Sequence, residues 1–197
     1  MSVTVDYWFT PQSPWTYLGH ERFARLLAQS GARVRVLPVD YGRIFPVSGG
    51  LPLPKRAPQR QAYRLVELAR WSRHLGVPMN VQPRFFPVDG TAASLLITAV
   101  AERDGAASAM ALTGRIMAAC WAGERDIADS QTLAELLSAC GLPEARLAES
   151  AARERYDAHT QEAIDAGVFG APTYVIGGEM FWGQDRLDFV ARKLGVG

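Results

Sequence analysis

Two short segments that lie far apart in the chain carry residues that can act together on a thiol. Ser13–Thr16 has the sequence SPWT and follows an apolar run, and Gly170–Thr173 has the sequence GAPT and precedes another. Proline favours the first position of a helix and serine favours the cap before it, so we expect Ser13 at the positive, amide-rich start of a helix. A serine hydroxyl in that place can hold a thiolate that another molecule supplies, although a plain helix cap is the alternative.

Pro172 predicts the other half of such a site. Cis peptide bonds occur almost only before proline, and we expect the Ala171–Pro172 bond to be cis. A cis proline in this place leaves the main chain of Ala171 free to pair with an extended peptide, as an added strand would. The alternative is a tight turn that needs proline only for packing. A strand that leads into a helix start facing a cis proline is the arrangement of a thioredoxin-type site.

The absence of cysteine from this arrangement decides the kind of chemistry. A redox thioredoxin carries Cys-x-x-Cys at the helix start, because the helix end stabilises a thiolate. This chain has Ser13 and Thr16 instead, and its two cysteines, Cys120 and Cys140, lie elsewhere in apolar helical contexts, where we expect them to be packing residues. Disulfide exchange is therefore not expected, and glutathione is the natural external thiol.

With these motifs the chain resembles the glutathione-dependent 2-hydroxychromene-2-carboxylate isomerases, which are relatives of the kappa-class glutathione transferases and of the DsbA-like oxidoreductases. The likeness runs nearly from end to end. Besides the two segments above, it rests on the Gly/Pro-rich stretch Gly49–Pro58, on Arg60–Tyr63 (RQAY), on Trp121 shortly before Asp126, and on Phe181–Leu187 (FWGQDRL).

The resemblance implies a fold and a set of site residues. The expected fold class is α/β, a thioredoxin-like fold with a large inserted all-helical subdomain. Residues 1–50 and 165–197 would form the thioredoxin-like domain, and residues 59–164 the helical subdomain. Ser13 would be the catalytic residue, which lowers the pKa of the glutathione thiol. The residues that bind glutathione would be Ala171, Pro172, Asp185, Arg186, Arg60 and Lys55.

Several of these assignments have simpler alternatives. Asp185 would hold the ammonium group of glutathione, yet an aspartate in a first helical turn is favourable whatever the function. Arg60 falls where the kappa-class pattern has a lysine that contacts glutathione, but isolated basic residues such as Arg60 and Lys55 are commonly just solvated. Leu51 departs from the pattern, because relatives have a glutathione-contacting asparagine there. Either Lys55 or a main-chain group would compensate, or the affinity for glutathione would be lower.

The elements that must position these residues follow from hydrophobic periodicity and from turn residues. Strands are expected at residues 3–9, 34–39, 173–176 and 179–182, the last two joined by a glycine hairpin. Helices are expected at residues 17–30, 63–75, 91–103, 106–122, 130–140 with Ser130 as the N-cap, 143–166 in one or two pieces, and 184–194. Residues 42–58 fit no regular element and are expected to form a long loop.

Composition places the chain among ordinary globular proteins. It has 197 residues, 48% hydrophobic and 21% charged, and a formal net charge of +1. This balance gives no electrostatic case for nucleic acid or an anionic membrane, no apolar run has membrane-spanning length, and the histidines lack metal-ligand spacing. The first residues show no secretory signal, so we expect a cytoplasmic location and small-molecule partners. The resemblance also implies that the protein forms a homodimer.

The leading interpretation is an enzyme, a glutathione-dependent isomerase that interconverts hydroxychromene carboxylate and hydroxybenzylidenepyruvate-type aromatics by reversible thiol addition. Arg60 or Lys55 could pair with the carboxylate of this substrate. Aromatic residues that could wall its pocket, if they are not core residues, are Trp15, Tyr17, Phe45, Tyr63, Phe85, Phe86 and Trp182. Two rivals are a kappa-like glutathione transferase, whose thiol stays attached to the product, and a thioredoxin-fold binding protein that only holds a peptide or partner.

Overall fold

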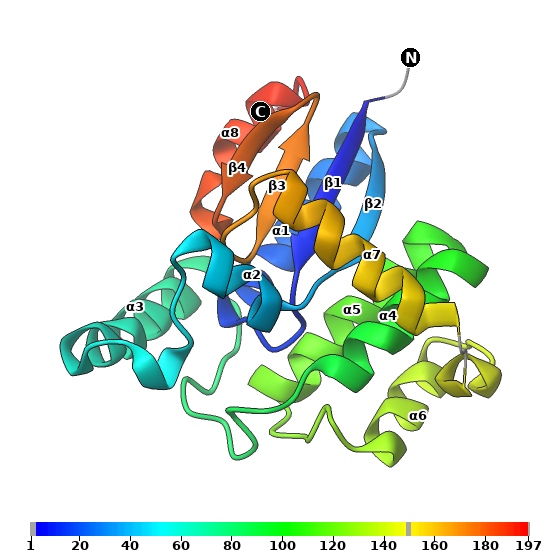
Figure 1. Ribbon diagram of the computed structural model, residues 1–197, viewed down its shortest axis with the longest axis horizontal. Coiled ribbons are helices and arrows are strands. Elements are labelled where there is room, and N and C mark those ends of the chain that lie inside the picture. Colours follow the sequence, from blue (N-terminus) through cyan, green and yellow to red (C-terminus); the bar gives the residue numbers. More distant parts are fainter. Residues whose placement is uncertain (1–2, 149–150, 197) are drawn as a thin grey trace.

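A mixed four-stranded sheet lies at the centre of the computed structural model, which describes residues 3–148 and 151–196. The strands are β1 (Thr4–Phe9), β2 (Arg33–Pro38), β3 (Thr173–Ile176) and β4 (Glu179–Trp182), arranged in the order β2-β1-β3-β4. β1 is parallel to β2 and antiparallel to β3, so the N-terminal and C-terminal parts of the chain meet in the middle of the sheet (Figure 1). All four strands were expected, with bounds that differ by at most one residue.

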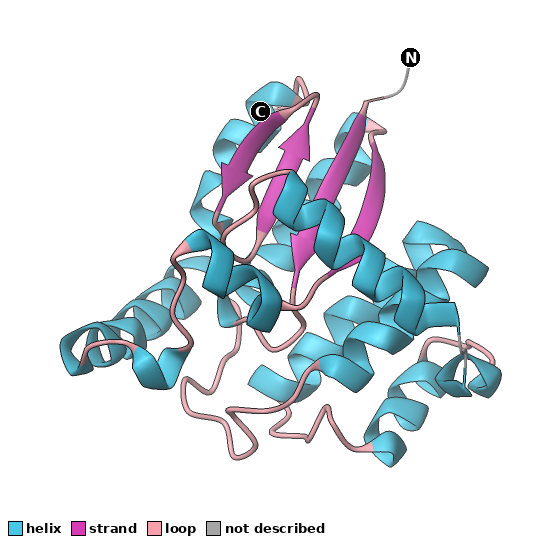
Figure 2. Ribbon diagram, viewed as in Figure 1, coloured by secondary structure: helices cyan, strands magenta, loops and turns pink. Residues whose placement is uncertain are grey.

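Helices cover both faces of this sheet and extend beyond one end of it (Figures 1 and 2). In the first half of the chain these elements are α1 (Pro14–Ser30), α2 (Tyr41–Ser48), the 3-10 helix η1 (Leu53–Lys55), α3 (Pro58–Leu75) and α4 (Thr91–Arg103). In the second half they are α5 (Gly105–Trp121), α6 (Ser130–Ala139), η2 (Glu144–Ala148), α7 (Ala151–Asp165), η3 (Gln184–Arg186) and α8 (Leu187–Lys193).

The alternation of side chains along β1 separates two hydrophobic clusters. Tyr7 is fully buried on one face, in a cluster that includes Phe23 of α1, Val190 of α8 and Ile116 of α5. Trp8 points to the other face, in a smaller cluster with side chains of α2 and α7. Successive residues of a strand face opposite sides, so one short strand anchors both layers of helices. The larger cluster joins the sheet to α4 and α5 without a break.

The arrangement confirms the predicted α/β fold of the thioredoxin type with a large helical insertion. The division into a domain at residues 1–50 and 165–197 and a subdomain at 59–164 stays a prediction. No helix in the described part of the chain is long and apolar enough to cross a bilayer.

The prediction of a long loop at residues 42–58 is wrong, because most of α2 and all of η1 lie in this segment. Asp40 caps α2, its Oδ1 accepting a hydrogen bond from the Gly42 main-chain N–H at 2.7 Å, and Gly49 ends the helix with a φ of 76°. Pro46 lies inside this short helix, where its missing N–H removes one helical hydrogen bond. Burial of Tyr41 and Ile44 against the sheet offsets that loss.

The ends of several helices also differ from expectation. α1 begins at Pro14, which agrees with the expected Ser13 cap although hydrophobic periodicity had placed the start at residue 17. α3 begins at Pro58, earlier than the expected start at residue 63, and here too a proline occupies the first position. Ser130 is not the N-cap of α6, because Asp129 occupies the cap and its Oδ2 accepts from the Thr132 N–H at 2.8 Å. The helix expected at 143–166 is η2 followed by α7, with residues 149 and 150 outside the described part.

Candidate functional site

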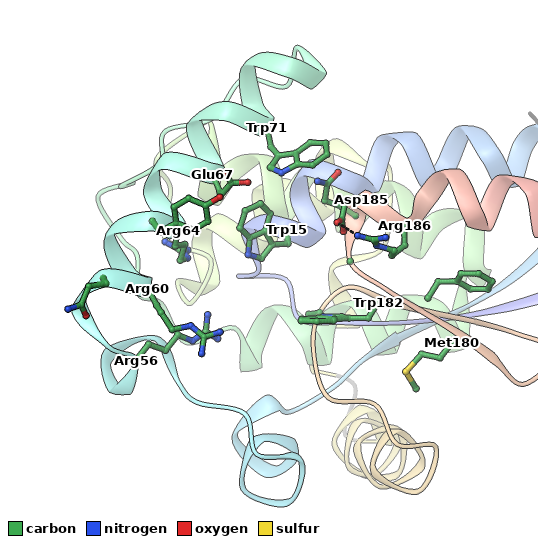
Figure 3. Close-up of a pocket in the computed structure, with 16 residues that line it drawn as sticks. Trp15, Arg56, Arg60, Arg64, Glu67, Trp71, Met180, Trp182, Asp185 and Arg186 are labelled. Atoms are coloured by element: carbon green, nitrogen blue, oxygen red, sulfur yellow. Dashed lines mark hydrogen bonds and ion pairs between the residues drawn. The ribbon is translucent and has the colours of Figure 1, made fainter.

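Two adjoining cavities lie between α3 and the end of the sheet where β1 leads into α1. Figure 3 shows the larger of these two, the Asp185 cavity, with the residues that line it. The Ser13 cavity, of about 600 Å³, is bounded by the start of α1, the segment from α2 to α3, Phe86 and the segment Phe169–Ala171. The Asp185 cavity, of about 860 Å³, is bounded by one face of α3, by β4 and by η3. The residues that line both are Trp15, Arg56, Arg60, Arg64, Ala171 and Trp182.

Ser13 is the N-cap of α1, as its sequence context predicts. Its Oγ accepts a hydrogen bond from the Thr16 main-chain N–H at 3.2 Å, and its residue is only 8% exposed. The cap uses the oxygen as an acceptor, so the hydroxyl hydrogen is the part of Ser13 that a ligand can accept. The helix dipole adds a partial positive charge at the same place, which favours a thiolate.

The Ala171–Pro172 bond is cis, as predicted. Two side chains hold the segment before it: the Tyr41 hydroxyl donates to the Gly170 carbonyl at 2.7 Å, and the Thr173 hydroxyl donates to the same oxygen at 2.6 Å. No hydrogen bond engages the main chain of Ala171 among residues 3–148 and 151–196. The Ala171 backbone is therefore available to a peptide ligand at the junction of the two cavities.

Pro172 connects the segment before it to the turn at Gly183, which lines the Asp185 cavity. Its carbonyl accepts a hydrogen bond from the Gly183 N–H at 2.9 Å, which fixes the turn between β4 and η3. Gly183 has a φ of 108°, a conformation that favours glycine, and the Asp185 side chain folds back toward it. Asp185 and Arg186 form an ion pair of 2.7 Å at the cavity edge, with side chains 40% and 49% exposed. An exposed pair of this kind is weak and can exchange partners with a ligand.

The two basic residues that the sequence singled out beside α3 have different places. Arg60, at the start of α3, lines both cavities, whereas Lys55 is exposed and lines neither. Leu51 lines the Ser13 cavity, and its carbonyl accepts a hydrogen bond from the Arg56 Nε at 2.8 Å. The chain therefore has a main-chain oxygen bonded to an arginine at the leucine that was expected to depart from the family pattern.

Arg56 and Arg64, neither of which was a predicted site residue, complete a group of arginines at the junction. Burial, followed by repulsion from Arg56, lowers the pKa of Arg64 to about 10. Burial, followed by repulsion from Arg60, lowers the pKa of Arg56 as well. The spacing of four residues from Arg60 to Arg64 was the available signal, because it aligns two side chains along one face of α3, whereas Arg56 lies before the helix begins.

The aromatic residues expected to wall a pocket divide between cavity and core. Those that line a cavity are Trp15, Phe45, Tyr63, Phe86 and Trp182. Tyr17 instead packs against the larger cluster and donates its hydroxyl to the Pro78 carbonyl at 2.6 Å. Phe85 lines neither cavity and lies under the Arg84 guanidinium. Trp182 sits against Gly170, where a Cβ would come within 2.3 Å of the indole Nε1, so glycine is required for this contact.

Other reactive groups lie away from the cavities. Burial raises the pKa of the Cys120 thiol to about 12, and burial also raises that of Cys140, so neither provides a thiolate at neutral pH. His20 is buried between the Tyr7 hydroxyl at 3.2 Å and the Met110 carbonyl at 2.9 Å. The described residues contain no group of three or more His, Cys, Asp or Glu side chains that could hold a metal ion.

Comparison with known proteins matches this geometry to a family. The description "DSBA-like thioredoxin domain" fits residues 4–195. A 2-hydroxychromene-2-carboxylate isomerase from Pseudomonas putida is 31% identical over 199 residues, covering 98% of this chain and 95% of that protein. Glutathione S-transferase kappa 1 from Caenorhabditis elegans is 27% identical over 207 residues, covering 96% and 90%. A solved structure of a 2-hydroxychromene-2-carboxylate isomerase superimposes with a TM-score of 0.81 at 29% identity, covering 98% and 94%.

Proposed function

We propose that this chain, which belongs to the 2-hydroxychromene-2-carboxylate isomerase family of DSBA-like thioredoxin domains, is a glutathione-dependent isomerase of aromatic carboxylates such as hydroxychromene carboxylate. The observation that carries the proposal is the position of Ser13. Its hydroxyl caps α1 through the oxygen and keeps its hydrogen for a ligand in a cavity that Ala171 also lines. A thiol held there by a peptide-like molecule lies at a positive helix end.

The residues present fit glutathione, which is an extended tripeptide with carboxylates at both ends and one ammonium group. The main chain of Ala171 can pair with its cysteinyl unit. Asp185 can take the ammonium group, and Arg186 and Arg60 can take carboxylates, all from the walls of the Asp185 cavity. Lys55 lies outside both cavities, so it has no part in this proposal.

Glutathione, when bound, supplies a thiolate that adds reversibly to a conjugated substrate, so that a former double bond can rotate before the thiol leaves again. Ser13 holds the sulfur by donating its hydroxyl hydrogen, which lowers the pKa of the thiol. Phe45, Phe86 and Trp15 give the Ser13 cavity an aromatic lining that can orient a flat ring beside the sulfur. In this arrangement the tripeptide occupies the Asp185 cavity and the substrate the Ser13 cavity.

A titration and an assay together test the proposal. Calorimetry measures whether glutathione binds, and the ultraviolet spectrum of 2-hydroxychromene-2-carboxylate follows its conversion with and without glutathione. Conversion that needs glutathione but does not consume it supports the isomerase. Accumulation of a stable conjugate, detected by mass spectrometry, would instead indicate a transferase like the kappa-class relative. If glutathione neither binds nor supports turnover, the result would favour the alternative of a thioredoxin-fold protein that only holds a peptide or a partner.

Two finer expectations extend the proposal beyond the chemistry of the site. Glutathione is abundant in the cytoplasm, where thiols stay reduced, and a chain that uses it and has two free cysteines suits that compartment. A homodimer remains a prediction from the family. Light scattering coupled to size-exclusion chromatography measures the oligomeric state directly.

A further inference from the structure

Arg64 lies at the junction of the two cavities, enclosed by aromatic rings. Its guanidinium carbon is 5.1 Å from the centroid of the Phe86 ring and 5.8 Å from that of Trp121. Trp121 is fully buried and Phe86 lines the Ser13 cavity, so the rings fix the arginine against the wall of that cavity. Cation–π contacts of this kind hold a guanidinium in place without neutralising its charge. Figure 3 shows Arg64 on α3, in line with Arg60.

The charge of Arg64 has no counter-ion in the described part of the chain. No ion pair joins it to a carboxylate of the described residues, and burial, followed by repulsion from the neighbouring Arg56, lowers its pKa. Arg56, Arg60 and Arg64 all line the Ser13 cavity, but no aspartate or glutamate does. The acidic residues nearby, Glu67 and Asp185, line only the other cavity and are paired with Arg70 and Arg186. An unpaired charge that is partly removed from water is costly, and an anionic ligand relieves that cost.

The arginines differ in what they can offer such a ligand. Arg56 donates its Nε–H to the Leu51 carbonyl, and Arg60 is exposed to solvent while it lines both cavities. Arg64 is held by aromatic faces and keeps the edges of its guanidinium for a ligand. A planar guanidinium beside an aromatic ring suits a flat ring that carries a carboxylate.

We propose that Arg64 binds the carboxylate of the aromatic substrate in the Ser13 cavity and so selects acids over neutral analogues. This inference rests on the proposed function, since it assigns the substrate to that cavity. The other source of a carboxylate is glutathione, whose proposed partners Asp185 and Arg186 line only the Asp185 cavity. Arg64 lines both cavities, but the Phe86 ring that holds it belongs to the Ser13 cavity alone. Arg64 is thus a specificity-determining residue, and Arg60 and Arg186 remain for the tripeptide.

The test uses a pair of unreactive ligands, chromone-2-carboxylate and its methyl ester, titrated by calorimetry into the whole protein. The wild type is expected to bind the acid more tightly than the ester. Arg64→Gln is expected to lower the affinity for the acid by roughly 10- to 100-fold, as for loss of a charge-assisted contact. Its affinity for the ester should equal that of the wild type. Arg64→Lys keeps the charge without the planar guanidinium, so its affinity for the acid should lie between those of the wild type and Arg64→Gln.

Arg73→Gln is the matched control. Arg73 lies on the same helix, is exposed and lines neither cavity, so its replacement should leave both ligands unaffected. If the wild type binds acid and ester equally, or if Arg64→Gln weakens both by the same factor, Arg64 does not recognise the carboxylate. Loss of glutathione binding in Arg64→Gln with unchanged binding of the acid would overturn the proposal in favour of the tripeptide carboxylate. These titrations need no turnover, so they stand apart from the isomerase assay.

Discussion

Ser13 Oγ accepts a hydrogen bond from the Thr16 main-chain N–H at 3.2 Å, across the first turn of α1. The oxygen accepts from the helix, which leaves the hydrogen of the same hydroxyl for a different acceptor. One side chain can therefore cap a helix and hold a thiolate at once. The sequence had offered these two roles as alternatives, and the geometry makes them compatible.

Replacing Ser13 by alanine should separate the two roles. We expect glutathione-dependent turnover to fall by roughly 10- to 1000-fold, the scale of one positioned donor. The free energy of unfolding should fall by only about 1 kcal/mol, as for a lost cap. Turnover is measured by the ultraviolet assay and stability by urea unfolding.

Asp129→Ala provides the control for the cap. Asp129 caps α6 with a hydrogen bond of 2.8 Å to the Thr132 N–H and lines neither cavity. Its loss should lower stability by a similar amount and leave turnover unchanged. Full activity of the Ser13→Ala protein would mean that Ser13 is a cap and nothing more.

Asp185→Asn should weaken glutathione by roughly 10-fold, because the amide cannot pair with the ammonium group. Asp188→Asn is the control, since Asp188 is paired with Arg22 at 3.1 Å, is 77% exposed and lines neither cavity. Calorimetric titration of glutathione into the variants compares them with the wild type. Equal affinity for all of them would remove Asp185 from the glutathione site.

Gly19→Ala should destabilise the protein although alanine favours helices. A Cβ at this position would lie 2.7 Å from the Cβ of Gln184, a residue that is 2% exposed. The helix propensity gain of up to about 1 kcal/mol is smaller than a buried clash, which costs about 1–3 kcal/mol. Thermal unfolding should show a lower Tm than wild type, with Glu21→Ala on the exposed side of α1 as the control. A raised Tm would contradict this prediction, because it would mean that α1 and η3 separate enough to accept the methyl group at no cost in stability.

His20 should make the protein less stable in acid. Burial lowers the pKa of His20 from 6.5 to about 4, so between these values the unfolded chain binds a proton that the folded chain does not. The contribution of His20 is present above pH 6.5 and is lost as the pH falls toward 4, by roughly 3 kcal/mol. His20→Gln should lose this part of the pH dependence, measured by urea unfolding at several pH values. Identical pH profiles for both proteins would contradict it.

The local motifs were predictable because each rests on the chemistry of adjacent residues. Ser13 before Pro14 predicts a helix start, and Ala171 before Pro172 predicts the cis bond, which the structure confirms. The hairpin at Gly177 and Gly178 follows from the same kind of rule. The family resemblance, which the comparisons confirm, brought these segments together.

What the sequence could not predict depends on contacts between distant residues. The helix α2 forms although Pro46 lies inside it, because Tyr41 and Ile44 are buried against elements far along the chain. Arg64 looks like one more solvated charge on a polar helix until Phe86 and Trp121 are seen beside it. Lys55, a predicted glutathione-binding residue because of its charge and its position in the sequence, lines neither cavity.

Helix α3 walls both cavities, yet of its 18 residues only Leu68 is buried. The surfaces opposite it come from α1, β4 and the segment before Pro172, which are tied into the sheet and its core. Substitutions along the inner side of this one peripheral helix can therefore give new substrate preferences while the thiol-holding half stays as it is. Enzymes built in this way can change their substrate specificity with little loss of stability.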